Sequence, residues 1–250
     1  MLSIFLTSGL SGCAKKDDVL NVAINAEFSP FEFLKNGEIV GFDIDLMGEI
    51  AKKLDMKFEI KNMDFEEVIE AVKSEDCDVA ISAITITPKR IQEVEFSAPY
   101  YTGAAQIIMV KEDDTVFTGT KKSELDEQLK NKKIGVCKDY VGEMYVSGSD
   151  DAGYEKIEGV QTTVYLNISM AVTALKSGAI DAIVIDNSIA KQMAGEDKGI
   201  KVIDVALTIE EYAIVLKKEN KDLKLKIDKA ISELKSDGVI DRLLSKWELN

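Results

Sequence analysis

The 250-residue sequence contains no histidine. Histidine is the side chain that most often acts as a general acid or base near neutral pH, activates a serine or cysteine nucleophile, or binds zinc and copper. Its absence removes those classes of catalytic and metal site. Basic residues are also in deficit, because 31 lysines and arginines stand against 45 aspartates and glutamates, a net charge of -14. Such a chain is a poor partner for nucleic acid or an anionic bilayer surface.

Cysteine is sparse as well, and Cys13, Cys77 and Cys137 lack the paired spacing of a disulfide framework or a metal site. Cys77 and Cys137 are expected to be small buried apolar side chains. Beyond the N-terminus, no segment approaches the roughly 18 apolar residues of a membrane span. The 46% apolar content still supplies ordinary cores. We expect a globular protein with no metal and no other cofactor, and no partnership with nucleic acid.

The N-terminus has a pattern of its own. A short apolar segment runs into Leu10-Ser11-Gly12-Cys13, and a charged spacer follows. This four-residue ending resembles the lipobox of bacterial lipoproteins, in which the chain is cut before the cysteine and the thiol takes up diacylglycerol. We therefore expect residues 1–18 to be a signal peptide and tether, with lipidation at Cys13 holding an extracytoplasmic body at the membrane. The alternative is a chance occurrence of the four residues.

From residue 17 onward, strand-like and helix-like segments alternate, which is typical of an α/β protein. The first set holds a strand, a hairpin turned at Asn36-Gly37, helices over 43–54 and 65–73, and a buried strand over 78–84. The residue pattern changes near 101–105, and a second set of strand-like and helix-like segments follows. Two α/β lobes are the economical interpretation. We place lobe 1 at 19–102 and 211–250, lobe 2 at 105–204, and hinge crossovers near 102–105 and 204–211.

Arg90 is the first candidate for chemistry. Thr87-Pro88 is a strong helix start, since threonine caps free backbone N–H groups and proline suits the first helical position. A cation in the first turn is misplaced with respect to the helix dipole, so Arg90 adds to the positive end and favours an anion. With Thr85 and the backbone at Ala83 in reach, the corner suits a carboxylate. The alternative is a surface ion pair between Arg90 and a nearby glutamate, Glu93 or Glu95.

Asp186 is the matching candidate in the second half. The strand over 182–185 runs into it and a helix follows, and open α/β sheets bind ligands at the carboxyl ends of strands. Asp186 could instead simply cap its helix. Phe28, which belongs to the loop after the first strand, and Phe65, which opens a helix, lie at binding edges but could equally be core. A guanidinium in one half and a carboxylate in the other fit the two ends of a zwitterion.

Several motifs carry a specific resemblance. Gly41-Phe42-Asp43-Ile44-Asp45-Leu46, followed by apolar residues at helical spacing, resembles the signature of the bacterial family 3 extracellular solute-binding proteins, the polar amino acid receptors of ABC importers. Further stretches are similar in order and spacing, from residue 19 to residue 247: FSPFEF (28–33), MDFEEVIEAVKSEDCDVAISAITITPKR (63–90), VEFSAPYY (94–101), GAIDAIVIDNSIA (178–190) and ISELKSDGVIDRLLSKW (231–247).

The resemblance implies a type II periplasmic-binding-protein fold, with two lobes joined by a two-strand hinge and the ligand in the cleft between them. It implies that Arg90 binds the ligand α-carboxylate, assisted by Thr85 and the backbone of Ala83. It also implies that Asp186 takes the α-ammonium group, and that Phe28 and Phe65 sandwich the side chain. The implied partners are a free amino acid, the permease subunits of an ABC transporter and, through Cys13, the membrane; the protein is expected to be a monomer and not an enzyme.

Two departures from the family pattern affect these expectations. Where relatives carry a Gly-Ser/Thr-Thr step, this chain has Asp139-Tyr140-Val141, so Val141 offers its N–H to the carboxylate but no hydroxyl. Asn25 stands where receptors for basic amino acids and glutamine have aspartate, which favours a neutral polar side chain in the ligand. Two rival functions stay open. One is a dehydratase on the same scaffold with Glu27 or Asp139 as general acid, and the other is a sensor or adhesin module.

Overall fold

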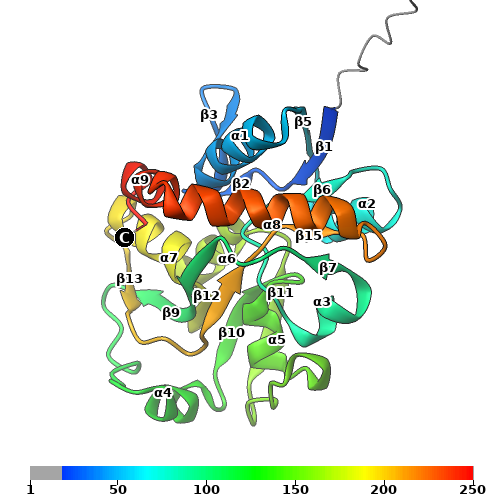
Figure 1. Ribbon diagram of the computed structural model, residues 1–250. Helices are drawn as coiled ribbons and strands as arrows, with labels where there is room; N and C mark the ends of the chain where they lie inside the picture. The colour runs from blue at the N-terminus through cyan, green and yellow to red at the C-terminus, as the bar shows by residue number, and fades with distance from the viewer. Residues whose placement is uncertain (1–18, 250) are drawn as a thin grey trace, which may run out of the picture.

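The structure is a computed structural model that describes residues 19–249 (Figure 1). The predictions for residues 1–18 and for lipidation at Cys13 lie outside the described residues. Within that part of the chain, no helix combines the length and the apolar character needed to cross a bilayer.

The first sheet contains segments from both ends of the chain. Its five strands lie in the order β5-β1-β6-β15-β7, in which β1, β5 and β6 are mutually parallel and β15 runs antiparallel to its neighbours. The strands are β1 (Val19–Ile24), β5 (Lys57–Asn62), β6 (Val79–Ala80), β7 (Glu95–Phe96) and β15 (Val215–Leu216). The expected strand over 78–84 is therefore wrong in extent, because at Ala83 the backbone turns to the left-handed φ of 46° and leaves the sheet.

The second sheet is built from the middle of the chain. Its strand order is β11-β10-β12-β9-β13, with β10, β11 and β12 parallel and β9 antiparallel to both of its neighbours. The strands are β9 (Gln106–Lys111), β10 (Lys133–Cys137), β11 (Gln161–Tyr165), β12 (Ala182–Asp186) and β13 (Ile200–Ile203).

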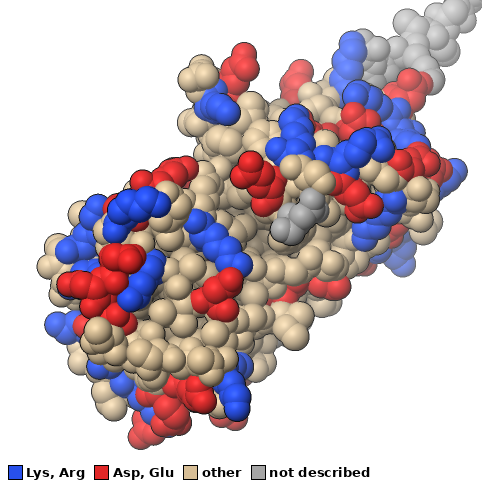
Figure 2. All heavy atoms as spheres, turned by 90° about the vertical axis from the view of Figure 1, so that its left-hand side faces the viewer, with Lys and Arg blue, Asp and Glu red and all other residues tan. Residues whose placement is uncertain are grey.

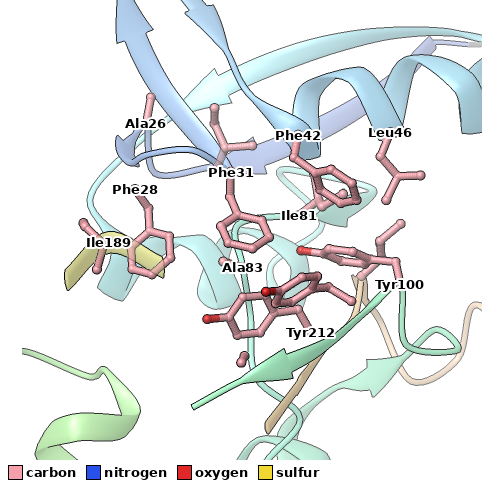
Figure 3. Packing of buried hydrophobic residues seen from close by; sticks show 14 of the residues in the cluster. Ala26, Phe28, Phe31, Phe42, Leu46, Ile81, Ala83, Tyr100, Ile189 and Tyr212 are labelled. Atoms are coloured by element: carbon pink, nitrogen blue, oxygen red, sulfur yellow. The ribbon is translucent and has the colours of Figure 1, made fainter. Parts of the chain in front are cut away.

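A two-stranded ribbon joins the two sheets. The chain leaves the first sheet through β8 (Tyr101–Ala104) and returns through β14 (Glu210–Tyr212), and the two strands pair antiparallel with Tyr101 opposite Tyr212. Both tyrosines pack on Phe31, with ring centroids 5.1 and 5.2 Å from its ring, and Figure 3 shows the Tyr212 ring beneath it. The predicted α/β class, with two lobes and a two-strand hinge, is confirmed.

Helices cover both faces of each sheet, and the alternation of side chains along the strands assigns each face. In the first lobe, Val22 and Ile24 of β1 face one core, and Ala23 faces the other. The helices there are α1 (Phe42–Leu54), α2 (Phe65–Lys73), α3 (Pro88–Glu93), α8 (Lys221–Ser236) and α9 (Val239–Lys246). Those of the second lobe are α4 (Lys122–Leu129), α5 (Val141–Ser147), α6 (Ile168–Ser177), α7 (Asn187–Glu196) and the short 3-10 helix η1 (Asp150–Ala152).

The C-terminal helices belong with α1. Helix α8 packs against α1 and crosses the first lobe in orange in Figure 1. The indole N–H of Trp247 donates to Asp45 of α1 at 2.7 Å, and Lys246 pairs with the same carboxylate. These contacts fasten the end of the chain to the lobe in which it begins.

A hairpin before α1 supports the cavity described below. β3 (Glu32–Lys35) pairs with β2 (Glu27–Phe28) on one side and with β4 (Glu38–Val40) on the other, through the predicted turn at Asn36-Gly37. Gly41, the first residue of the GFDIDL motif, has φ 145°, and a Cβ there would lie 1.9 Å from the Phe31 carbonyl oxygen. Only glycine fits this close approach of two backbones.

The surface carries charges of both signs. On the face shown in Figure 2, basic and acidic side chains are interspersed over both lobes. Many charged side chains of the described surface form short ion pairs, such as Lys73, on another face, with Glu70 and Glu93. Exposed pairs of this kind each stabilise a fold by no more than about 1 kcal/mol, so they add solubility more than stability.

Candidate functional site

A small cavity lies between the lobes, with a free volume of about 20 Å³. Its first-lobe wall is formed by Phe28, Glu32, Phe65, Ser82, Ala83, Thr85 and Arg90, and its second-lobe wall by Tyr140, Val141 and Asp186. Seven of the eight predicted ligand-binding residues are therefore brought together here. The exception is Asn25, and the residues that sequence reasoning missed are Glu32, Ser82 and Tyr140.

Arg90 reaches the cavity from the first turn of α3. Thr87 caps that helix as predicted, since its hydroxyl accepts a hydrogen bond from the Arg90 backbone N–H at 3.2 Å. The Arg90 side chain is buried, and its guanidinium donates to the carbonyl oxygens of Thr85, at 2.9 Å, and Asp139, at 3.0 Å. The alternative of a surface pair with Glu93 is not what forms, because Glu93 binds Lys73 instead.

Asp186 approaches from the opposite lobe, as the last residue of β12. Its side chain is only 5% exposed, and it makes no capping hydrogen bond to α7, so the helix-cap alternative is not what forms. Instead, it accepts a 2.6 Å hydrogen bond from the Tyr212 hydroxyl of the hinge. Burial, and then the nearby charge of Glu210, raise the pKa of Asp186 to about 7.

Two groups that were expected to contact the ligand carboxylate are already hydrogen-bonded to other groups of the protein. The Ala83 N–H donates to Asp43 at 2.9 Å, so this group is already engaged. The Thr85 hydroxyl donates its single proton to Glu210 at 2.7 Å. Toward the cavity this hydroxyl can therefore only accept a hydrogen bond. The Thr85 side chain is suited to an ammonium group, and the expectation that it would assist a carboxylate is corrected by this geometry.

A pair of buried carboxyl groups lies behind the first-lobe wall. Asp43 accepts from the Ala83 N–H and from the Tyr100 hydroxyl, both at 2.9 Å, and burial raises its pKa to about 6. Glu32 accepts from the Ser82 hydroxyl at 2.9 Å. Burial and the neighbouring Asp43 charge raise the pKa of Glu32 well above its ordinary value. The second oxygen of each group, Glu32 Oε2 and Asp43 Oδ1, is buried without a donor from any other residue of the described structure, and the hydrogen bond between the two carboxyl groups is made when they share one proton.

Glu32 was missed because the sequence argument treated FSPFEF only as a source of aromatic walls. The available signal was an acidic residue between two phenylalanines, directly after the binding-edge loop. Asn25, which was expected to contact the ligand instead, is not among the lining residues, and its side-chain amide donates to the Met63 carbonyl at 3.0 Å.

Aromatic rings form the remaining walls. Phe65 lies under the Arg90 guanidinium, with its ring centroid 5.6 Å from Cζ, an attractive cation–π arrangement. Tyr140 approaches Phe65 at 4.7 Å and Phe28 at 6.0 Å between ring centroids, edge to face in both cases. Figure 3 shows Phe28 between Phe31 of its own lobe and Ile189 of α7. Contacts of both lobes with the same rings indicate that the cleft is closed.

This geometry defines a class of protein: a two-lobed α/β binding protein in which a buried cavity, with a guanidinium on one wall and a carboxylate on the other, lies between lobes joined by a hinge.

The chain belongs to the bacterial extracellular solute-binding proteins, family 3, whose family model matches residues 20–250. It is 29% identical to the probable histidine-binding protein of Neisseria gonorrhoeae over 94% of this chain and 84% of that one. It is 30% identical to the arginine-binding extracellular protein ArtP of Bacillus subtilis (strain 168), over 96% and 90%. The structure matches an ancestral arginine-binding protein bound to arginine, with a TM-score of 0.80, 40% identity, and coverage of 92% and 97%. The predicted type II periplasmic-binding-protein fold is confirmed.

Proposed function

We propose that this protein is the solute-binding component of an amino acid ABC importer, which captures a free L-amino acid between its lobes and delivers it to a membrane permease. One observation carries the proposal above all. Arg90 and Asp186, buried and of opposite charge, come from different lobes and line the same cavity. A zwitterionic amino acid presents the complementary pair of charges.

In the proposed complex, Arg90 holds the α-carboxylate, with the backbone N–H of Val141 as a second donor. Asp186 and the Thr85 hydroxyl accept from the α-ammonium group. Phe28 and Phe65 flank the side chain. Both groups have only lone pairs to offer the ammonium, because Asp186 already accepts from the Tyr212 hydroxyl and the Thr85 hydroxyl already donates its proton to Glu210.

Binding in this scheme is coupled to closure. When the lobes separate, Arg90 and Asp186 part, and each is hydrated on its own. A ligand that contacts both interacts with the closed form more strongly than with the open form, so it shifts the population toward closure. Permease recognition of the closed form would then link capture to transport.

For the side chain of the ligand we propose a cationic group, in place of the neutral polar one that Asn25 favoured. Glu32 brings a buried carboxyl group to the cavity wall, and the ionised form of such a group is costly unless a donor meets it. A terminal ammonium, guanidinium or imidazolium supplies that donor and neutralises the charge. The names of the relatives reported above, which bind arginine or are described as histidine-binding, support the same class.

We also propose that the protein acts by binding and not by catalysis. The relatives reported above are binding proteins by name. The general acids that a dehydratase would require, Glu27 or Asp139, are not among the residues that line the cavity of the described chain. A lipid anchor at Cys13, a monomeric state and delivery to permease subunits belong to the same proposal.

Calorimetric titration with the twenty amino acids and ornithine tests this function. Arg90→Ala and Asp186→Ala should each weaken binding of the best ligand by roughly 10- to 150-fold, because a hydrogen bond to a charged group contributes about 1.5–3 kcal/mol. The matched control is Arg242→Ala, since Arg242 is exposed on α9 and bonds only to the Asp237 carbonyl among the contacts of the described chain. Wild-type affinity in both site variants would refute the proposal.

A further inference from the structure

Tyr140 is the one aromatic ring that the second lobe contributes to the cavity wall of the described chain. It precedes the first residue of α5, in the segment where the resemblance to the family pattern breaks. Its backbone is extended, with φ -78° and ψ 160°, and its side chain does not cap the helix. The ring is therefore free to project across the cleft, where it contacts Phe65 and Phe28 of the other lobe.

The position of this ring is fixed from both sides. The Tyr140 N–H donates to the Cys137 carbonyl at 3.2 Å, which ties the turn to the end of β10. The preceding residue, Asp139, has a left-handed φ of 61°, and its carbonyl accepts from the Arg90 guanidinium of the first lobe. In the closed form, Arg90 thus holds the very turn that carries the Tyr140 ring against the opposite wall.

The cavity is small as a consequence. Its free volume is about 20 Å³, little more than the space that a single water molecule occupies. Phe28 and Phe65 are the two rings expected to flank the ligand side chain, and Tyr140 lies edge to face against both. The ring therefore takes up space at the place where a long side chain would extend beyond them.

We propose that Tyr140 is a specificity-determining residue that limits the length of the ligand side chain and forms, with Phe28 and Phe65, a three-ring cage for a short cationic group beside Glu32. This inference rests on the proposed function. The faces of the three rings attract a cation, and a cation beside Glu32 favours the ionised form of that carboxyl group, which then supplies the counter-charge. Because Tyr140 reaches the other two rings only across the closed cleft, the cage and its size limit exist only after closure.

The test compares wild type, Tyr140→Ser and the matched control Tyr140→Phe, titrated with L-arginine, L-lysine, L-ornithine and L-2,4-diaminobutyrate. Removing the ring should raise affinity for arginine relative to 2,4-diaminobutyrate by roughly tenfold or more, since one or more methylene-sized groups then gain room. Tyr140→Phe keeps the ring and should keep the wild-type ratio within about threefold. Tyr140→Leu replaces Tyr140→Ser if the serine variant does not fold, as judged by thermal unfolding.

The outcomes separate the two proposals. An unchanged ratio in Tyr140→Ser, or an equal change in Tyr140→Phe, overturns the role of the ring while amino acid binding stands. Failure of wild type to bind any α-amino acid, with Arg90→Ala equally inert, overturns the proposed function and this inference with it. A higher ratio in Tyr140→Ser alone supports both.

Discussion

The two walls of the cavity are held in different ways. On the first-lobe wall, the hydrogen bonds of Asp43 come from Ala83 and Tyr100, and that of Glu32 comes from Ser82, so the network closes within one lobe. On the second-lobe wall, Asp186 is held by Tyr212 of the hinge and the turn at Asp139 is held by Arg90 of the opposite lobe. The carboxyl network of the first wall does not depend on closure, whereas the contacts of the second wall do.

This difference assigns the walls different tasks. A wall whose polar groups are satisfied locally is preorganised, and a ligand binds it with little further ordering. A wall whose contacts cross the cleft contributes only when the lobes meet, so its interactions favour the closed state. Substitutions in the carboxyl network behind the first-lobe wall should therefore act mainly on folding stability, and those on the second-lobe wall mainly on affinity.

Asp43→Ala should give the largest effect. It leaves two buried donors, the Ala83 N–H and the Tyr100 hydroxyl, without their acceptor. Each unsatisfied buried group costs about 1–3 kcal/mol, so the free energy of unfolding should fall by roughly 2–5 kcal/mol. Chemical denaturation measures this. The matched control is Asp45→Ala on the same helix, whose contacts to Lys246 and Trp247 are partly exposed and should cost about 1 kcal/mol or less.

A similar loss for both aspartate variants would remove the special status of the first-lobe wall. So would an Asp43→Ala protein that keeps wild-type stability and loses only affinity, because the network would then serve the ligand and not the fold.

The sequence predicted much of this site because its signals were local. The Thr87 cap before Pro88, the strand end at Asp186 and the turn at Asn36-Gly37 each depend on a few neighbouring residues, and each formed as expected. The family pattern placed Arg90 and Asp186 around one cavity, although they are 96 positions apart in the chain.

The sequence could not show which hydrogen-bond donors and acceptors of the site are already bonded to other groups of the protein. The Ala83 N–H and the Thr85 hydroxyl looked available to a ligand, but Asp43 and Glu210 already engage them. Those partners come from α1 and from the hinge, at separations of 40 and 125 residues. Tyr140 likewise reads as an ordinary helix-start residue until the lobes close and bring it to Phe65.

The pH dependence of folding stability provides a second comparison of the two walls, through Asp43 on one side and Asp186 on the other. The folded-state pKa values of Asp43 and Asp186, about 6 and about 7, lie above the ordinary unfolded value near 3.9, so the folded protein binds more protons between these limits. Their contribution is fully present below about pH 4 and is lost as pH rises through 6 and 7. The ligand-free protein should be less stable at pH 8 than at pH 5, by about 1–3 kcal/mol.

Bound ligand should oppose the part of this stability loss that Asp186 causes at the higher pH values, because an α-ammonium group beside Asp186 favours the ionised form of its carboxyl group. Affinity should therefore rise between pH 5 and pH 8, as measured by titration calorimetry at several pH values.

Asp186→Asn should flatten the curve of stability against pH above pH 6 and leave the lower part of the curve, which is due to Asp43, unchanged. Several groups interact electrostatically with the Asp186 carboxyl group. They are Glu210 and Tyr212 of β14, Gln106 of β9, Arg90 of α3, Glu32 of β3, Cys137 of β10 and Tyr140. A flat profile from pH 5 to pH 8 would contradict the assignment.

Glu210→Gln should give the smallest effect and the sharpest distinction between the walls. Glu210 sits on the hinge, buried, and accepts from Thr85 of the first lobe, Gln106 of the second and Thr208 beside it. An amide keeps the size but offers one acceptor oxygen fewer, so one hydroxyl must turn. Affinity should fall by only about three- to tenfold, near 1 kcal/mol, because the Thr85 hydroxyl loses its fixed orientation toward the ligand ammonium.

The pH profile shows whether Glu210 acts through charge. Since its charge raises the pKa of Asp186, the midpoint of the affinity curve should move to lower pH in Glu210→Gln. A purely structural role would lower affinity at every pH and leave the midpoint in place. Glu211→Gln, at the neighbouring exposed position of the same strand, is the matched control and should change neither quantity. A midpoint that stays fixed while affinity falls would mean that the hinge carboxylate positions Thr85 but does not set the charge state of the second-lobe wall.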